Sequence, residues 1–351
     1  MSVINVGIVG FGYAAQTFHL PFLKALAEDE RVAIAMVSSS DAAKVHAHLP
    51  GVDVVSDPAE LCQNPALDLV IITSPNDSHA KWAEFALTAG NHVLLEKPLT
   101  TRLSDAEHLA TLAEKQQRML VPFQNRRWDG DFLTLKQLIA EQAVGPIHYF
   151  ESHFDRFRPQ PRDRWRENGG EGSGIYWDLA PHLIDQTVNL FGMPQTITAN
   201  LRALRPGAKS VDYFHLLLGY EDKEVVLAAS PYMAAPNPRF VLQGEKGSYI
   251  KLGLDPQEDA LKLGVSPLQQ GFGAEAEADW GRLHNAEVAK SQPTLAGDYV
   301  SFYRQLLAAI RGEAAAPVPV TDAVGVIRLL ELGELSAKEQ RTVSCQLKHF
   351  E

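Results

Sequence analysis

The sequence predicts an α/β protein with an N-terminal doubly wound parallel sheet and a C-terminal α/β domain built on a large, mostly antiparallel, open-faced sheet. Two observations predict it. Short apolar runs rich in β-branched residues alternate with helix-like segments over the first third of the chain, whereas strand-like runs later follow one another without intervening helices. The length of 351 residues suits two domains, which we place at residues 1–124 and 125–351.

The first domain repeats a unit of one strand and one helix. Near-continuous apolar runs are typical of strands that are buried on both faces. We expect strands at residues 3–9, 32–37, 67–72, 92–95 and 119–122. We expect helices at residues 14–28, 42–49, 77–89 and 104–117. This alternation favours a parallel sheet with helices on both faces.

The second domain changes pattern, because one helix at about residues 130–142 precedes an alternating stretch at 147–154. Further strands are expected at residues 196–204, 212–220, 224–230, 238–243 and 247–252. A helix at 178–190 is expected to cover one face of this sheet and to leave the other open. We therefore expect a homodimer or homotetramer formed through the open face.

The C-terminal third contains an unusually long connection at residues 255–297, which has weak periodicity and forms either a surface arm or a lid. Sequence does not decide between them. Helices at residues 299–311 and 321–340 then carry apolar residues at three- and four-residue spacing. We expect these two helices to pack at the domain junction.

The composition excludes several classes of protein. Lys and Arg total 32 against 43 Asp and Glu, and the net charge of −11 argues against a nucleic-acid or membrane-surface partner. No apolar run approaches the roughly 20 residues of a transmembrane helix. Cys62 and Cys345 indicate a reducing compartment, and the N-terminus has no secretion signal, so we expect a cytoplasmic protein. No cluster has metal-ligand spacing, and we expect no metal.

A dinucleotide-binding motif follows the first strand, where Gly10-x-Gly12-x-x-Ala15 opens the first helix. Gly10 permits the tight turn, Gly12 lets the backbone approach a pyrophosphate, and Ala15 allows close packing of helix on sheet. Tyr13 and Ala14 complete the loop. The motif stands at the first strand-to-helix turn of a doubly wound domain, so the sequence predicts a Rossmann-type cofactor site.

The end of the second strand bears on the choice of cofactor. Enzymes that prefer NAD place an acidic side chain there, whereas this chain has Ser38, Ser39 and Ser40. The three hydroxyls leave room for a 2′-phosphate, and Lys44 supplies a positive charge. The sequence favours NADP, while Asp41 keeps NAD possible if the loop bends it inward.

Two later loops are expected at the same carboxyl edge of the sheet, where open α/β folds bind ligands. One loop contains Ser74, Pro75 and Asn76, with His79 close behind, and we expect it to contact the cofactor, although Asn76 could simply cap the next helix. The other loop is Glu96-Lys97-Pro98, in which a lysine closes a buried strand.

These motifs together resemble the Gfo/Idh/MocA family of nicotinamide-dependent oxidoreductases, and the resemblance covers essentially the whole chain. It rests on Gly10-x-Gly12-x-x-Ala15, His19-x-Pro21, Ser74-Pro75-x-x-x-His79, Glu96-Lys97-Pro98 and Asp178-x-x-x-His182-x-x-Asp185. The segments at residues 124–129, 164–167 and 176–179 look like the branch that contains NADP-dependent scyllo-inositol dehydrogenases. One departure is Ser40, because the family's Ser-Ser pair is often followed by Arg.

The resemblance implies that Lys97 is the catalytic lysine and that Asp178 and His182 complete the site. Residues four apart on a helix share one face, so the last two can both point at a substrate. It also implies cofactor contacts from Glu96, Pro98 and Trp165. Substrate contacts are expected from Arg127, Trp128, Arg164 and Tyr176. An ion-pair network is the structural alternative for the arginine- and tryptophan-rich segments.

The expected reaction is hydride transfer between the nicotinamide and a secondary alcohol or ketone of a cyclic polyol or sugar. His182 is the expected base, and Lys97 is expected to stabilise the developing alkoxide. The substrate could equally be an aldose, a dihydrodiol or another keto-sugar. Two other classes stay open: a glycosidase that uses NAD transiently, and a non-catalytic regulator that senses NADP.

Overall fold

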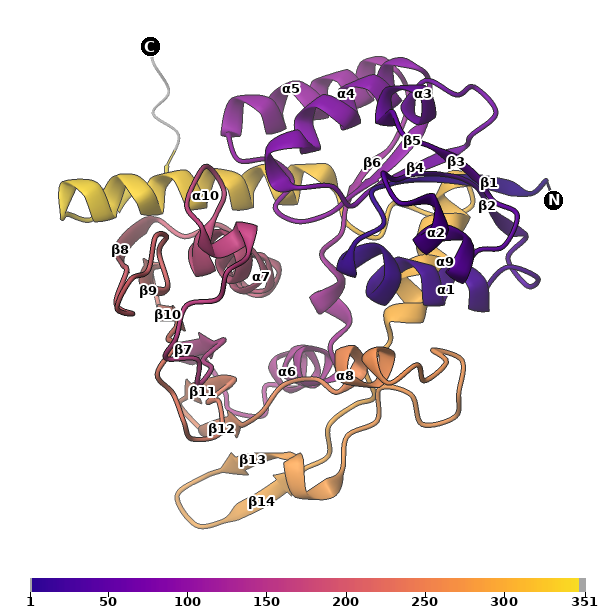
Figure 1. Cartoon of the computed structure of the whole chain (residues 1–351). Helices are drawn as coiled ribbons and strands as arrows, with labels where there is room; N and C mark the ends of the chain where they lie inside the picture. The colour runs from indigo at the N-terminus through magenta and orange to yellow at the C-terminus, as the bar shows by residue number, and fades with distance from the viewer. Residues whose placement is uncertain (1, 347–351) are drawn as a thin grey trace. The chain divides into compact units, whose positions relative to one another are not determined.

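Six parallel strands form the first sheet, in the spatial order β3-β2-β1-β4-β5-β6 (Figure 1). The structure is a computed structural model and describes residues 2–346. The strands are β1 (Ile4–Val9), β2 (Val32–Ser38), β3 (Asp53–Val55), β4 (Leu69–Ile72), β5 (His92–Leu95) and β6 (Leu120–Pro122). The order reverses between β1 and β4, and doubly wound sheets bind their ligands at the carboxyl ends of the strands beside such a reversal.

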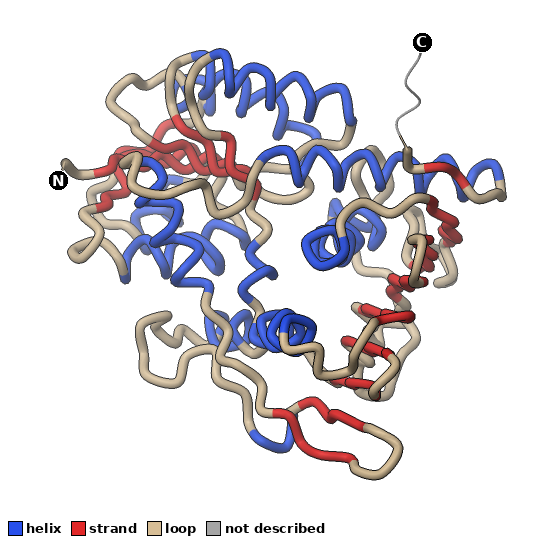
Figure 2. The backbone as a smooth tube through the Cα atoms, turned by 180° about the vertical axis from the view of Figure 1, so that it is seen from behind, coloured by secondary structure: helices blue, strands red, loops and turns tan. Residues whose placement is uncertain are grey.

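Helices cover both faces of this sheet. The helical segments up to residue 128 are η1 (Ala15–His19), α1 (Leu20–Ala25), α2 (Ala42–His48), α3 (Pro58–Cys62), η2 (Asn76–Ser78), α4 (His79–Thr88), α5 (Leu103–Lys115) and η3 (Asn125–Trp128). Helices α3, α4 and α5 lie on one face, and α1 lies on the other together with α9 (Tyr299–Ile310) (Figures 1 and 2). The predicted doubly wound sheet is confirmed.

The chain divides into two compact units that are both discontinuous in sequence. Unit 1 comprises residues 1–128, 257–272 and 298–324, and unit 2 comprises residues 129–256, 273–297 and 325–351. Helix α8 (Gln257–Lys262) and α9 therefore belong to the same unit as the parallel sheet. Helix α10 (Val320–Glu339) begins in unit 1 and continues in unit 2.

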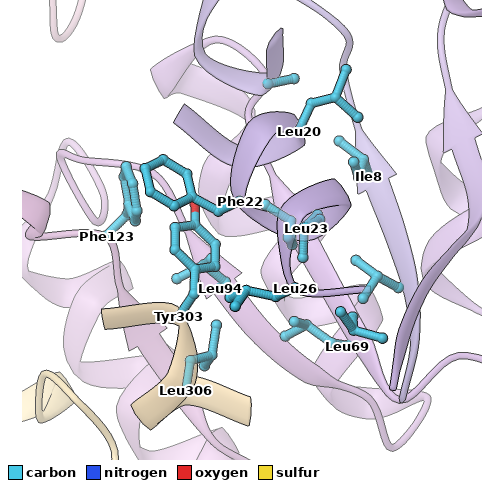
Figure 3. Packing of buried hydrophobic residues seen from close by; sticks show 14 of the residues in the cluster. Ile8, Leu20, Phe22, Leu23, Leu26, Leu69, Leu94, Phe123, Tyr303 and Leu306 are labelled. Atoms are coloured by element: carbon cyan, nitrogen blue, oxygen red, sulfur yellow. The ribbon is translucent and has the colours of Figure 1, made fainter. Parts of the chain in front are cut away.

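Aromatic side chains from α1 and α9 build much of the core of unit 1. The rings of Phe22 and Tyr303 are stacked with centroids 4.8 Å apart (Figure 3). Phe123 packs edge-on against Phe302 with centroids 5.2 Å apart. All four side chains are buried. Since burial of an aromatic side chain is a large favourable term in folding, α9 is an integral layer of this unit although it begins 177 residues after the end of β6.

The sheet of unit 2 has nine strands in the order β14-β13-β12-β11-β7-β10-β9-β8-β15. Its strands are β7 (Ile147–His153), β8 (Thr196–Arg202), β9 (Tyr213–Gly219), β10 (Glu224–Ala229), β11 (Phe240–Gly244), β12 (Gly247–Lys251), β13 (Gly281–His284), β14 (Ala289–Gln292) and β15 (Val343–Ser344). Only β7 and β10 pair in parallel; the other neighbours are antiparallel. The predicted mostly antiparallel sheet is confirmed.

One face of this second sheet carries helices. Helices α6 (Gly130–Ala140) and α7 (Gly174–Phe191) lie on that face, and among the described residues no helix covers the opposite face (Figures 1 and 2). Side-chain burial alternates along β9 accordingly. Leu216 and Leu218, on one face, are fully buried, whereas Leu217, on the other face, is 37% exposed.

Several expectations about single elements need correction. Strand β3 and helix α3 lie where we expected neither, since both are short and give a weak periodic signal. The first helix ends at Ala25 rather than residue 28, and its first turns are π-helical. Helix α7 begins at Gly174 instead of residue 178, because burial of Tyr176 and Trp177 outweighs their modest helix propensity.

The long connection at residues 255–297 contains regular secondary structure. Its first part contains α8 and lies in unit 1, whereas the strands β13 and β14 extend the sheet of unit 2 as a hairpin. A short turn η5 (Glu277–Asp279) precedes the hairpin. The segment is therefore neither a single arm nor a single lid. Residues 257–272 belong to unit 1, and residues 273–297 belong to unit 2.

Candidate functional site

The turn after β1 has the geometry of a dinucleotide-binding loop. Gly10 has a φ of +85°, and a Cβ there would lie 3.2 Å from Oγ1 of Thr73, so only glycine fits without strain. At Gly12, no described atom apart from its chain neighbours lies within 4 Å of an added Cβ. The Gln16 N–H donates to the Gly12 carbonyl at 3.2 Å, so the helical turn starts at this glycine. An exposed backbone at a helix start fits a pyrophosphate.

The loop after β2 shows what its acidic residue does. Asp41 caps α2, and its Oδ1 accepts a hydrogen bond of 2.9 Å from the Lys44 backbone N–H. The Ser39 hydroxyl oxygen in turn accepts from the Asp41 N–H at 3.1 Å. Ser38 is buried, whereas the side chains of Ser40 and Lys44 are exposed. The carboxylate is thus used in capping, and the exposed groups next to it are a hydroxyl and an ammonium.

The loops after β4 and β5 are joined by one buried imidazole. Nδ1 of His79 lies 2.9 Å from the Pro98 carbonyl oxygen, and Nε2 lies 3.0 Å from the Ser74 carbonyl oxygen. Burial lowers the pKa of His79. Both ring nitrogens face carbonyl oxygens, which only accept, so a neutral ring donates to one of them and contacts the other. Asn76 begins the 3₁₀ turn η2 and is buried. His79 therefore fixes both loops.

Lys97 follows β5 and is held by the carboxylate beside it. The Lys97 N–H donates to Oε2 of Glu96 at 3.1 Å, while Oε1 of Glu96 lies 3.0 Å from Nε2 of His19. Nδ1 of His19 lies 2.9 Å from the Tyr303 hydroxyl, which donates to the Phe18 carbonyl. Burial alone would raise the pKa of Glu96, but the hydrogen bond and charge of His19 and the charge of Lys97 hold it below its ordinary value. Glu96 is therefore ionised and supports the lysine.

In unit 2, α7 carries the second group of predicted catalytic residues. Asp178 and His182 lie four residues apart on this helix and so share one face, as the spacing predicts. Oδ1 of Asp178 lies 3.4 Å from Nη1 of Arg166. His182 is buried, and its ring meets Phe154 edge-on with centroids 6.4 Å apart.

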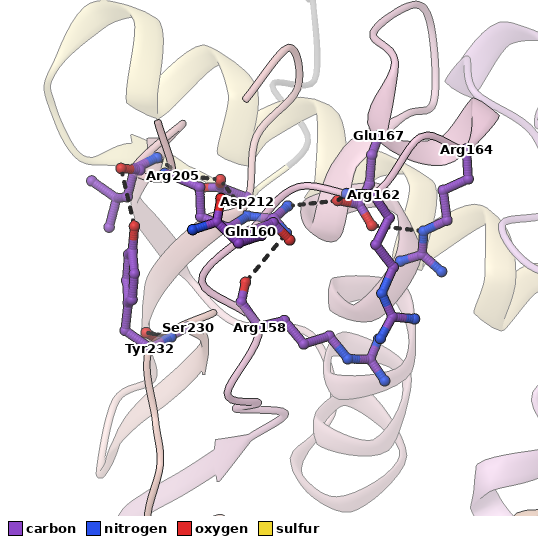
Figure 4. Close-up of polar contacts among 10 residues, drawn as sticks. Arg158, Gln160, Arg162, Arg164, Glu167, Arg205, Asp212, Ser230 and Tyr232 are labelled. Atoms are coloured by element: carbon purple, nitrogen blue, oxygen red, sulfur yellow. Dashed lines mark hydrogen bonds and ion pairs between the residues drawn. The ribbon is translucent and has the colours of Figure 1, made fainter. Parts of the chain in front are cut away.

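The loop before α7 is held by an ion-pair network inside unit 2. Nε of Arg164 lies 2.6 Å from Oε1 of Glu167, and Arg205 bridges Glu167 at 2.9 Å and Asp212 at 2.8 Å (Figure 4). Burial, followed by the charges of neighbouring arginines, lowers the pKa of Arg158. The Arg164 side chain is 36% exposed.

The other predicted ligand residues fall into different environments. Nη2 of Arg127 lies 2.9 Å from Oδ2 of Asp322, and Trp128 packs edge-on against Phe302 at 5.2 Å; these contacts belong to unit 1. Tyr176 is fully buried, and its hydroxyl donates to the Leu330 carbonyl at 2.8 Å. We therefore do not propose Tyr176 as a substrate ligand. Trp165 opens the turn η4 (Trp165–Glu167), but its side chain lies outside the described residues.

Some residues of the site carried no local sequence signal. Glu258 on α8 contacts Tyr13 of the cofactor loop, and Tyr303 on α9 contacts His19. Each pair is separated by more than 240 residues. Among the described residues no group of three or more His, Cys, Asp or Glu side chains is arranged to hold a metal ion. No helix in residues 2–346 is both long and apolar enough to cross a membrane.

Two family models match the chain. Residues 4–123 match a model described as an oxidoreductase family NAD-binding Rossmann fold, and residues 136–345 match the C-terminal alpha/beta domain of the same oxidoreductase family. The two matches correspond to the two sheets and include Gly10, Lys97 and His182.

Similar proteins match over nearly the whole chain. The uncharacterized oxidoreductase YdgJ of Escherichia coli is 47% identical, covering 97% of this chain and 98% of that protein. A Bacillus subtilis protein named scyllo-inositol 2-dehydrogenase (NADP(+)) IolW is 37% identical, covering 98% of this chain and 96% of its own. The solved structure of the oxidoreductase YPO2259 from Yersinia pestis superposes with a TM-score of 0.92 at 45% identity, covering 99% of each chain.

Proposed function

The chain belongs to the Gfo/Idh/MocA family of oxidoreductases, and from that premise we propose that it interconverts a secondary alcohol and a ketone of a cyclic polyol with NADP. Scyllo-inositol is the proposed substrate. The observation that carries this choice is the 37% identity to a named NADP-dependent scyllo-inositol 2-dehydrogenase across 98% of the chain.

The residues of unit 1 fit a nicotinamide dinucleotide. Gly10 and Gly12 present backbone at the first helix start, and the loops after β4 and β5 are fixed by His79. The nicotinamide ring would accept or donate the hydride. We propose that the chain holds the dinucleotide phosphates at the Gly10–Ala15 turn and that Ser74, Pro75 and Lys97 line its reactive end.

NADP preference rests on the loop after β2. The Asp41 carboxylate accepts the Lys44 N–H within the cap of α2, which leaves Ser39, Ser40 and the Lys44 ammonium to face a 2′-phosphate. A phosphate beside a lysine gains a charge-assisted hydrogen bond. We propose a preference for NADP over NAD on this basis.

The chemical roles follow from the side chains. We propose that His182 accepts the hydroxyl proton during oxidation and returns it during reduction. Lys97 stabilises the negative charge that develops on the substrate oxygen, and its position is set by Glu96. Asp178 orients the substrate hydroxyls, with Arg166 at 3.4 Å neutralising its charge, and Arg164 contributes a further donor.

We further propose that the protein is a homodimer or homotetramer formed through the helix-free face of the nine-stranded sheet. Leu217 and Ile250, each 37% exposed, lie on strands of that sheet. Both belong to one cross-strand row that runs through Val226, Glu151 and Val241. Exposed apolar side chains on a sheet face are typical of subunit interfaces. Cys62 and Cys345 are both free thiols, which supports our proposal of a reducing, cytoplasmic location.

The reaction is tested by following nicotinamide absorbance with NADP and with NAD over a panel of inositol isomers and aldoses. Lys97→Ala is the inactive control, and Lys115→Ala, an exposed lysine on α5, is the matched control. We expect turnover of an inositol with NADP that is lost in Lys97→Ala and kept in Lys115→Ala. Turnover of an aldose but of no inositol would identify the substrate as an aldose and not a cyclic polyol. NADP binding without turnover of any substrate would indicate a sensor. Tightly retained, non-exchanging NAD would indicate a glycosidase.

A further inference from the structure

Helix α8 is fastened to unit 1 by buried contacts. The Gln257 side chain is fully buried; its amide donates to the Trp128 carbonyl at 3.1 Å, and its oxygen accepts from the Tyr299 N–H at 2.9 Å. One turn later, Leu261 enters the hydrophobic core of the unit. These contacts anchor the first turn of α8 within unit 1, where α8 neighbours η1.

The residue between these anchors reaches the cofactor loop. Oε1 of Glu258 accepts a hydrogen bond of 2.9 Å from the Tyr13 hydroxyl, and Tyr13 directly follows Gly12. Oε2 of Glu258 pairs with Nη2 of Arg126 at 2.8 Å, and Nζ of Lys262 lies 2.9 Å from Oε1. The carboxylate therefore connects the glycine-rich turn, the end of the parallel sheet and α8.

The charges in this cluster keep the connection formed at neutral pH. Burial raises the pKa of Glu258, but Arg126, Lys262 and the Tyr13 hydrogen bond outweigh it and lower the pKa to about 2. Burial and the Glu258 charge raise the pKa of Tyr13 to about 12. The phenol therefore stays a donor and the carboxylate an acceptor, and hydrogen bonds to charged groups are the stronger kind.

We propose that Glu258 is a positioning residue for the cofactor: by holding the Tyr13 hydroxyl it fixes the Gly10–Ala15 turn around the dinucleotide and slows cofactor release. The residue acts through Tyr13 and not by contact with the nicotinamide. The inference rests on the dinucleotide binding of the proposed function but needs no particular substrate. It can therefore be wrong while the proposed reaction is right, and the proposed substrate can be wrong while this inference is right.

The test measures the rate at which NADPH dissociates, by stopped-flow fluorescence, in the full-length protein. Tyr13→Phe removes a single oxygen from a side chain that is 52% exposed, so the fold is retained. We expect it to speed NADPH release about tenfold, the loss expected for one hydrogen bond to a charged group. Tyr232→Phe is the matched control, an exposed tyrosine in unit 2 that is expected to leave the rate unchanged.

A second background separates action through Glu258 from direct contact of Tyr13 with the cofactor. In the Glu258→Gln protein the bond to Tyr13 is no longer charge-assisted, so Tyr13→Phe should speed release by less than about threefold there. An unchanged tenfold effect in that background would overturn the proposal, because Tyr13 would then act alone. A change below twofold in the wild-type background, or the absence of NADPH and NADH binding, would overturn it as well.

Discussion

Nε2 of His19 lies 3.0 Å from Oε1 of Glu96, and both residues are buried. The second oxygen of Glu96 accepts the Lys97 N–H. A buried hydrogen bond of this kind fixes the geometry of the residue that follows it, because moving the imidazole away would leave the buried Glu96 carboxylate without this partner.

Breaking this pair should destabilise unit 1. Glu96→Gln keeps the shape but removes the charge, and we expect the free energy of unfolding to fall by about 3 kcal/mol. Glu84→Gln is the control, since Glu84 pairs with His108 at 3.4 Å with half its side chain exposed, and such pairs contribute less than about 1 kcal/mol. Urea denaturation measures the free energy of unfolding of both variants. Equal losses would contradict the claim that the buried Glu96 contact stabilises the protein more than the exposed Glu84 contact.

Stability at acid pH should depend on Glu258. Its pKa is lowered from 4.5 to about 2 in the folded protein, so the unfolded chain takes up the proton at higher pH. The stabilisation is therefore complete above pH 4.5 and is lost as the pH falls towards 2. Urea midpoints measured from pH 3 to pH 7 should decline more steeply at the acid end in wild type than in Glu258→Gln. Parallel curves would count against this linkage.

The proposed base is tested by His182→Asn. This change keeps a polar side chain but removes the group that takes the hydroxyl proton, so we expect kcat to fall by about 10²- to 10⁴-fold. His182 lies on α7 in unit 2 and outside the dinucleotide-binding loop, so the NADPH dissociation constant should stay within about twofold. A kcat near that of wild type would assign the proton transfer to another group.

Cofactor preference is tested by Lys44→Met. The cap of α2 is retained, because Asp41 accepts from the backbone N–H of residue 44. Loss of the ammonium should lower kcat/KM for NADP by about tenfold and leave the value for NAD unchanged. Lys115→Met on α5 serves as the control. Equal losses for both cofactors would show that Lys44 does not face the 2′-phosphate.

The open sheet face is tested by Leu217→Asp. Leu217 points away from the buried side of β9, opposite Val226 on β10 and Thr198 on β8. A charge at the centre of a subunit interface should shift the protein to monomers, as measured by analytical ultracentrifugation. Leu263→Asp, at a leucine that is 84% exposed, should keep the wild-type mass. A wild-type monomer would refute the proposed assembly.

Local pattern was a good guide to the two sheets and to the loops at their edges. Apolar runs predicted β1, β2, β4, β5 and β6 to within a few residues, and the Gly10 turn lies where the motif placed it. Signals failed where segments are short, as for β3, or where burial decides the helix start, as at Gly174. Spacing of three and four residues predicted α9 but not that it packs under the parallel sheet.

The sequence by itself determined the fold class, the cofactor loop and the i, i+4 relation of Asp178 and His182, because each depends on residues close together in the chain. Only the tertiary structure decided that Glu258 meets Tyr13 and that Tyr303 meets His19. The physical reason is that periodicity records which face of an element is buried, whereas the partner of a buried polar group depends on how distant segments pack.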